Sequence, residues 1–396
     1  MYTDPSSSSF YAEAALSGIV QTSRKPALAY LPEAGNTLGS KVALRYKHWG
    51  IWHEITWQEL AGRVNALVEQ LTRWGIGSGV RVAFLGDLTP ELLQYLLAVQ
   101  SLGGIAVRFG DATDADWPVT RLAQANIRLI ITSQKAIAGL ASTGIEVLWL
   151  DGKVDSSPGA QAGLPWLEQA LKNIEPEDPA FELHARGQND ALITTTLTHQ
   201  ALHHQGRHMT VDYAMTPSDR LLISPATADR VFIRFIHGLW LVSGLQLHLA
   251  ESPASAGIDR REIGPSRLIG SPEDYQAIRQ DALERMPPPG SAYRRWLDWT
   301  LAVGAGDGRH SGAVQTSIAW HLSLKPLREA LGLTRIDTAL VVGGSLSAID
   351  TAFFMALGMT VQGIDPLYGR SRPEGYFSTA DFVPAGLGVK PQPDQN

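Results

Sequence analysis

Four histidines lie within ten residues of one another, at His199, His203, His204 and His208. Two pairs are spaced by four residues, so each pair could share a metal ion on one face of a helix, and Asp212 extends the stripe of His204 and His208 by another four. The two pairs point about 100° apart around such a helix, and Gly206 weakens the helix that would carry them. We therefore expect a solvated helix face here and no metal site.

One glycine-rich string is placed where a ligand could bind. In Val342-Gly343-Gly344-Ser345-Leu346-Ser347, an apolar strand pattern runs into a turn and then into a helix pattern. Ligands of doubly wound sheets bind at the carboxyl ends of strands, which makes Gly343, Gly344 and Ser345 candidate binding residues. The denser run Gly304–Gly308 follows a helix pattern instead of a strand and predicts a flexible loop.

The same glycine-rich string supports a rival interpretation as a serine hydrolase. It nearly matches the pattern Gly-x-Ser-x-small, in which Ser345 would be the nucleophile. In α/β-hydrolases the histidine base follows the serine in the chain, whereas no histidine occurs after His321. An upstream histidine would have to approach Ser345 in space, so the hydrolase stays the weaker alternative.

The elements that must position these residues alternate between strands and helices. From Lys41 onward, short β-rich runs are separated by helical patterns, which is typical of crossover units and a largely parallel sheet. A capping box at Thr56 and Glu59 predicts the clearest helix. Trp296 and Trp299 have helical spacing beside apolar residues, which predicts that they lie in the core. One sheet is expected to hold the strands Ile105–Phe109, Arg128–Thr132, Ile145–Leu150 and Ala191–Thr195.

The predicted fold class is α/β, with two packed, doubly wound and largely parallel αβ lobes. A chain of 396 residues, 44% of them hydrophobic, has enough apolar material for two such lobes. We expect a tail and lead-in over 1–40, a first α/β lobe over 41–215, a second α/β lobe over 216–365 and an irregular C-terminal remnant over 366–396.

Composition excludes several classes of partner and chemistry. A formal net charge of −6 gives no basic field for a phosphate backbone, so nucleic acid is not an expected partner. The chain has no cysteine, which excludes disulfides and thiolate chemistry. The N-terminal residues do not resemble a secretory signal, and the most apolar helical stretch, Val231–Gly244, is too short to cross a bilayer. We expect a cytoplasmic protein with no integral membrane segment.

The order of several short strings resembles the large N-terminal part of the AMP-forming acyl-CoA ligases, and most of all the long-chain fatty acid–CoA ligases of the adenylate-forming superfamily. The resemblance runs from about Lys41 to about Pro391. Its strings include Leu44-Arg45-Tyr46, Gly50-Ile51-Trp52, Ile55-Thr56-Trp57, Pro90-Glu91, Leu102-Gly103-Gly104, Ile263-Gly264-Pro265, Lys325-Pro326-Leu327-Arg328 and Val342-Gly343-Gly344-Ser345-Leu346. The resemblance implies ATP, magnesium and CoA as cofactors, a fatty acid as substrate, and an adenine ring against Gly343-Gly344-Ser345.

The chain departs from that family where phosphate would be held. The family's phosphate loop reads Thr-Ser-Gly-Thr-Thr-Gly-x-Pro-Lys-Gly, shortly before Leu-Thr-His. Here Ile193-Thr194-Thr195-Thr196 runs straight into Leu197-Thr198-His199, without the loop's glycines, proline and lysine. The resemblance therefore implies that Thr194, Thr195 and Thr196 are the stub of the loop.

The second family signature, Tyr-Gly-x-Thr-Glu, is also altered. The nearest string is Tyr368-Gly369-Arg370-Ser371-Arg372, in which arginine replaces the magnesium-binding glutamate. By resemblance, Tyr368 and Gly369 are the remaining candidates for contact with the nucleotide. The family's Thr-Gly-Asp motif is missing, and its C-terminal domain with the catalytic lysine is not found before the chain ends at Asn396.

These departures predict a degenerate relative that does not adenylate fatty acids and has no assigned catalytic or metal-binding residue. It would keep an acyl or nucleotide pocket, or act as a regulatory or scaffolding partner of a full-length ligase or another protein. The alternative is an active ligase subunit that a partner chain completes, with Arg230, Arg234 and Arg370 available to hold phosphate. The serine hydrolase that uses Ser345 is the third hypothesis.

Overall fold

The computed structural model describes residues 25–109, 117–122, 124–133, 139–150, 163–186, 192–223, 228–304 and 320–364. Within these residues the strands form three sheets, of six, four and three strands. A short lead-in, η1 (Ala27–Ala29) and α2 (Tyr30–Thr37), precedes the first strand. None of the described helices combines the length and the apolar character that crossing a membrane requires.

The six-stranded sheet has the order β6-β5-β3-β4-β7-β8. Its strands are β3 (Arg81–Leu85), β4 (Ile105–Phe109), β5 (Leu129–Thr132), β6 (Glu146–Trp149), β7 (Pro179–Arg186) and β8 (Leu192–Thr198). The prediction that one sheet holds four strands, near residues 105–109, 128–132, 145–150 and 191–195, is confirmed by β4, β5, β6 and β8. Five of the six strands are parallel, and only β8 is antiparallel to its neighbour β7.

Helices cover both faces of this sheet, as a doubly wound fold requires. Val82 and Phe84 point to the face covered by α3 (Trp57–Arg73), α4 (Pro90–Ser101) and α6 (Pro165–Leu171). Ala83 and Leu85 point to the opposite face, with α5 (Trp117–Leu122) and η2 (Leu140–Thr143). The predicted capping box of α3 is present, because the Thr56 and Glu59 side chains each bond the other residue's backbone N–H.

The four-stranded sheet has the order β2-β1-β10-β9 and joins segments that are far apart in the chain. Its strands are β1 (Val42–His48), β2 (Ile51–Thr56), β9 (Arg220–Ile223) and β10 (Gln246–Leu249). Between β8 and β10 run α7 (His199–Asp212), the π-helix η5 (Ala228–Ile236) and α8 (His237–Ser243). Because β1 pairs with β10, residues assigned by sequence to the first lobe share a sheet with residues of the second. The lobe boundary at 215 stays a prediction.

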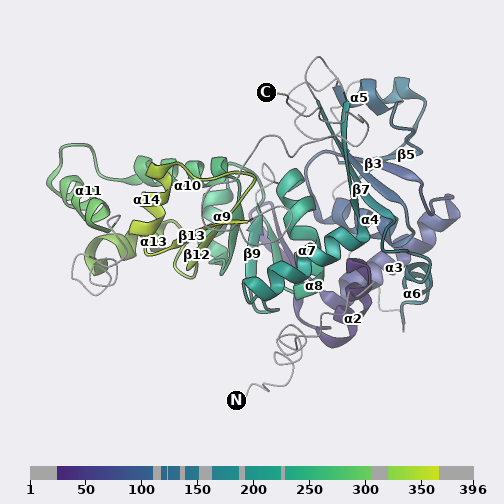
Figure 1. Cartoon of the computed structure of the whole chain (residues 1–396), viewed down its shortest axis with the longest axis horizontal. Helices are drawn as coiled ribbons and strands as arrows, with labels where there is room; N and C mark the ends of the chain where they lie inside the picture. Colours follow the sequence, from purple (N-terminus) through teal and green to yellow (C-terminus); the bar gives the residue numbers. More distant parts are fainter. Residues whose placement is uncertain are drawn as a thin grey trace, which may run out of the picture.

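The three-stranded sheet is parallel, with the order β11-β12-β13. Its strands are β11 (Leu268–Gly270), β12 (Thr338–Val342) and β13 (Thr360–Ile364), and its helices are α9 (Ala256–Ile263), α10 (Pro272–Arg285), α11 (Ala292–Gly304), η6 (Trp320–Leu324), α13 (Lys325–Ala330) and α14 (Ala348–Ala356). Helices α10, α11, α13 and α14 lie with β12 and β13 at one end of an elongated molecule, and the six-stranded sheet lies toward the other end (Figure 1).

The predicted core position of two tryptophans is wrong. Trp296 and Trp299 of α11 are 39% and 54% exposed, and their rings contact each other with centroids 5.4 Å apart. Leu297 between them is buried. A helix buries only one stripe of residues, and here the leucine occupies the buried stripe while the indoles lie outside it.

Candidate nucleotide site

Thr194, Thr195 and Thr196 lie inside strand β8 and not in a loop. They pair with His184, Leu183 and Glu182 of β7 in a ladder that runs from Arg186 opposite Leu192 to Pro179 opposite Thr198. Successive N–H groups of an extended strand point to opposite edges, whereas a phosphate cradle needs neighbouring N–H groups that converge on one anion. The three threonines therefore do not form an anion cradle. The connection between β7 and β8, residues 187–191, lies outside the described residues.

The N-terminus of α7, which directly follows β8, is closed by the protein itself. A helix start offers free N–H groups that can hold an anion. Here the first three are engaged: His199 N–H donates to the Asp178 carbonyl (3.1 Å), Gln200 N–H to the Pro176 carbonyl (2.7 Å) and Ala201 N–H to the Thr198 hydroxyl (3.1 Å). This helix start consequently has none of these three donors left for a phosphate.

The Gly343-Gly344-Ser345 turn lies where the sequence predicts it, between β12 and α14. Gly343 has φ +76°, is exposed, and would leave a Cβ in open space. A Cβ on Gly344 would lie 3.1 Å from Cγ of Pro272, so this residue is glycine because α10 approaches closely. The Ser347 hydroxyl caps α14 by accepting from the Asp350 N–H at 3.1 Å. The turn thus presents an open backbone surface at Gly343, between a close contact with α10 and the capped start of α14.

The structure does not join the two predicted halves of the site in one sheet. Thr194–Thr196 belong to the six-stranded sheet and Gly343–Ser345 follow a strand of the three-stranded sheet. Tyr368, Gly369 and Arg370 lie outside the described residues. Arg230 and Arg234, the other arginines predicted to be available for phosphate, both belong to η5. Arg234 is half-buried, and the side chain of Arg230 is not among those that the structure describes.

The expected solvated face of α7 is wrong for two of its four histidines. His199 and His203 are 1% and 3% exposed, and the Tyr30 hydroxyl lies 3.3 Å from Nε2 of His203. Burial lowers the pKa of each to about 4, because a charged imidazole would lose its hydration. His204 is exposed, as expected, and His208 is half-buried. Helix α7 packs against α8 and η1, which buries the first pair.

Sequence reasoning missed a buried charged cluster on β7. Glu182 accepts from Nε and Nη2 of Arg81 at 3.0 and 2.8 Å, and its Oε2 lies 3.4 Å from Nε2 of His184. The contact with His184, assisted by Arg81, lowers the pKa of Glu182 to about 2, although burial acts in the opposite direction. The spacing of Glu182 and His184 by two residues in a strand pattern, which puts both on one face, was the available signal.

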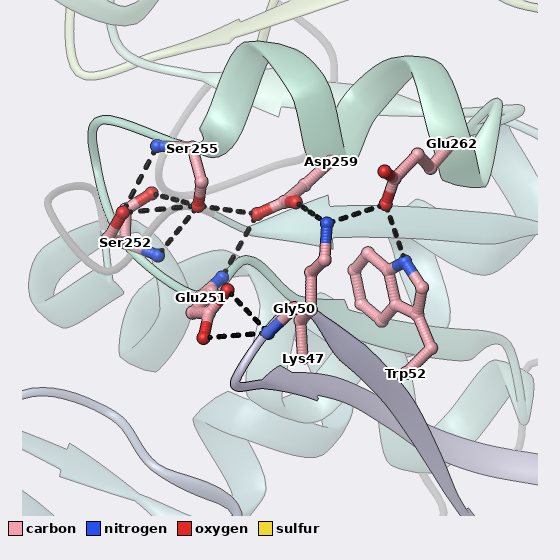
Figure 2. Close-up of polar contacts among 8 residues, drawn as sticks. All are labelled: Lys47, Gly50, Trp52, Glu251, Ser252, Ser255, Asp259 and Glu262. Atoms are coloured by element: carbon pink, nitrogen blue, oxygen red, sulfur yellow. Dashed lines mark hydrogen bonds and ion pairs between the residues drawn. The ribbon is translucent and has the colours of Figure 1, made fainter.

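A second network clamps the β1–β2 hairpin to the segment after β10 (Figure 2). Lys47 Nζ lies 2.9 Å from Asp259 Oδ1 and 2.7 Å from Glu262 Oε2, and Trp52 Nε1–H donates to Glu262 at 2.8 Å. Hydrogen bonds to Glu262 and Asp259 raise the pKa of Lys47. Each charge in this cluster is used to hold two segments of the chain together, so we assign it a structural role.

The profile of the family described as "AMP-binding enzyme" matches residues 31–362. The chain belongs to this family.

Individual relatives of this AMP-binding family member are distant. FR901469 synthetase of Dothideomycetidae sp. (strain 11243) is 23% identical over 166 residues, which is 42% of this chain and 1% of that protein. The fatty acyl-adenylate ligase of L. pneumophila, solved with acyl adenylate and pyrophosphate, has a TM-score of 0.59 and 13% identity over 84% of this chain and 53% of its own. The N-terminal subdomain of Klebsiella oxytoca NpsA, solved with 3-hydroxybenzoyl-AMSN, has a TM-score of 0.54 and 16% identity, covering 86% and 71%.

These similarities confirm the predicted fold class and the family, but they give no support to the serine hydrolase. Neither β8 nor the start of α7 offers converging N–H donors. No group of three or more His, Asp or Glu residues that could hold a metal ion occurs in the described part of the chain.

Proposed function

We propose that this AMP-binding family member does not adenylate a fatty acid, but keeps an acyl or nucleotide pocket or a regulatory or scaffolding role. The observation that carries the proposal is the β7–β8 ladder, which runs directly into a closed helix start. Removal of one preorganised donor commonly costs an enzyme about a hundred- to a thousandfold in rate. Here a whole set of donors is committed to the fold.

Ligand binding without chemistry is supported by the open turn at Gly343. It leaves room for a flat ring, and the similar NpsA N-terminal subdomain was solved in complex with 3-hydroxybenzoyl-AMSN. The ligand class we propose is therefore an acyl-adenylate, or a nucleotide with a short acyl group. We also propose that the protein acts in the cytoplasm.

Adenylation is tested by pyrophosphate–ATP exchange with magnesium and a panel of fatty and amino acids. We expect exchange at the level of a protein-free blank, because the triphosphate lacks its donors. A known acyl-CoA ligase run in parallel shows that the assay works. Magnesium-dependent exchange above the blank by this chain alone would refute the proposal. Exchange that appears only with a co-purified chain would instead favour the alternative of a ligase subunit completed by a partner.

Ligand binding is tested by thermal shift with acyl-sulfamoyl adenosines. We expect a rise in melting temperature that Gly343→Val removes, because the new side chain would occupy the space beside the turn. Gly75→Val is the matched control, since Gly75 has φ +75° and equally open surroundings but lies at the end of α3. Both variants carry the same backbone strain. Equal thermal shifts in the two variants would show that the ligand does not lie against Gly343.

A further inference from the structure

We propose that His204 and His208 bind a divalent transition-metal ion, represented by Zn²⁺, on the solvent side of α7. Their Nε2 atoms lie 3.2 Å apart and their ring centroids 4.3 Å apart. Two nitrogens bound to one Zn²⁺ at about 2.0–2.1 Å are separated by about 2.9–3.4 Å for bond angles of about 90–110°. The two nitrogens therefore already have the separation of ligands on one ion.

The pair is accessible and its chemistry suits such an ion. His204 is exposed and His208 half-buried, so water can complete the coordination shell. Imidazole nitrogen is a preferred ligand of zinc, copper and nickel. Partial desolvation, helped by neighbouring His208 and Arg207, lowers the pKa of His204, which favours the neutral ring that a metal ion binds. In the free protein one Nε2–H faces the other Nε2, so binding requires that ring to carry its proton on Nδ1 instead.

The ion would reinforce α7 where the helix is weakest. Gly206, the least favourable helix residue apart from proline, lies midway between the two histidines. It is glycine because a Cβ there would lie 2.4 Å from the backbone carbonyl carbon of Gly238 in α8. A metal bridge from His204 to His208 spans this glycine with one cross-linked turn. Metal binding should consequently add to the stability of the folded chain.

Other histidine pairs of the described chain are less suitable. His199 and His203 are buried, and Nε2 of His203 contacts the Tyr30 hydroxyl. His48 and His53 of the β1–β2 hairpin are exposed, but their ring centroids are 6.5 Å apart. We therefore expect the ion to bind His204 and His208, with water as its remaining ligands. His48 and His53 are the competing pair that the experiment must exclude.

The test uses the untagged full chain, freed of metal with a chelator and titrated with ZnCl₂ by calorimetry. We expect one binding event per chain whose Kd rises at least tenfold in His204→Gln and in His208→Gln. His321→Gln, which removes an exposed histidine of η6, is the matched control and should leave Kd unchanged. Zinc should also raise the melting temperature of the parent chain, but not of the two α7 variants.

A spectroscopic measurement separates metal binding from altered folding. With Cu²⁺ at one equivalent, electron paramagnetic resonance should show two equatorial nitrogens in the parent chain and one in each α7 variant. An unchanged Kd in both α7 variants would overturn the proposal. Loss of zinc binding in His53→Gln but not in the α7 variants would also overturn it and place the ion on the hairpin.

Discussion

Acidification from about pH 7.5 to about pH 5 should unfold this chain, because it buries four neutral histidines. The pKa of His199 and of His203 is lowered to about 4, and that of His237 and of His248 to about 3, in each case chiefly by burial. An unfolded chain has histidine pKa values of about 6.5. Below that pH the unfolded state takes up protons that the folded state refuses until about pH 4 to 3, so stability falls as the pH falls.

The expected loss is large because the four groups act in the same direction. Each histidine that is protonated only in the unfolded state removes about 1.4 kcal/mol of stability per pH unit, hence about 2 kcal/mol by pH 5. Four such losses together are comparable with the whole stability of an ordinary domain, about 5–15 kcal/mol. In addition, both ring nitrogens of His237 and of His248 have no hydrogen-bond partner among the described residues, so no such bond there favours their charged forms.

Urea unfolding at a series of pH values measures this effect, with the proton uptake read from the slope of stability against pH. His237→Leu should flatten the slope by about one proton, and should leave stability at pH 7 equal or higher, because it removes two unpaired nitrogens between Phe181 and Phe232. Constant stability between about pH 7 and about pH 5.5 would show that the histidines are charged or hydrated in the folded state.

Local signals in the sequence predicted most of the elements. The capping box at Thr56 and the run from β12 into α14 are both present. Each of these features depends only on residues within one or two helical turns, so the local sequence is enough to predict it. The partner of a strand depends on the remainder of the chain. The pairing of β1 with β10, about 200 residues away, and the antiparallel direction of β8 therefore had no local signal.

The candidate site shows the same division. The Gly343 turn is a local strand–turn–helix feature and lies where it was predicted. The run Ala191–Thr195 was predicted as a strand from its β-branched residues, and its pairing with β7 places Thr194–Thr196 in that strand, whereas the loop stub was implied only by the family resemblance. His199 and His203 are buried because α8 and η1 pack against α7. The spacing of residues within α7 cannot predict which other elements pack against it.

The contact between α7 and α8 leaves no room for a methyl group at Gly206 or at Gly238. A Cβ on Gly238 would lie 2.1 Å from the Leu202 carbonyl oxygen, and a Cβ on Gly206 would lie 2.4 Å from the backbone of Gly238. Both obstacles are backbone atoms of helices, which cannot rotate away as a side chain does. The two helices therefore touch backbone to backbone, and any larger residue must push them apart.

Gly238→Ala should destabilise the chain by about 3 kcal/mol or more, at the upper end of the cost of overpacking a core. The better helix propensity of alanine, worth about 1 kcal/mol, does not offset this clash. Gly257→Ala in α9 is the matched control: its Cβ would meet only the flexible Asp281 carboxylate, at 3.4 Å, so propensity should prevail and stability should rise or stay equal. Urea unfolding of both variants at neutral pH decides the matter. Equal stability of the two variants would mean that α7 and α8 do not approach this closely. The close contact with Gly238 would then no longer explain why position 206, which the proposed zinc bridge spans, is a glycine.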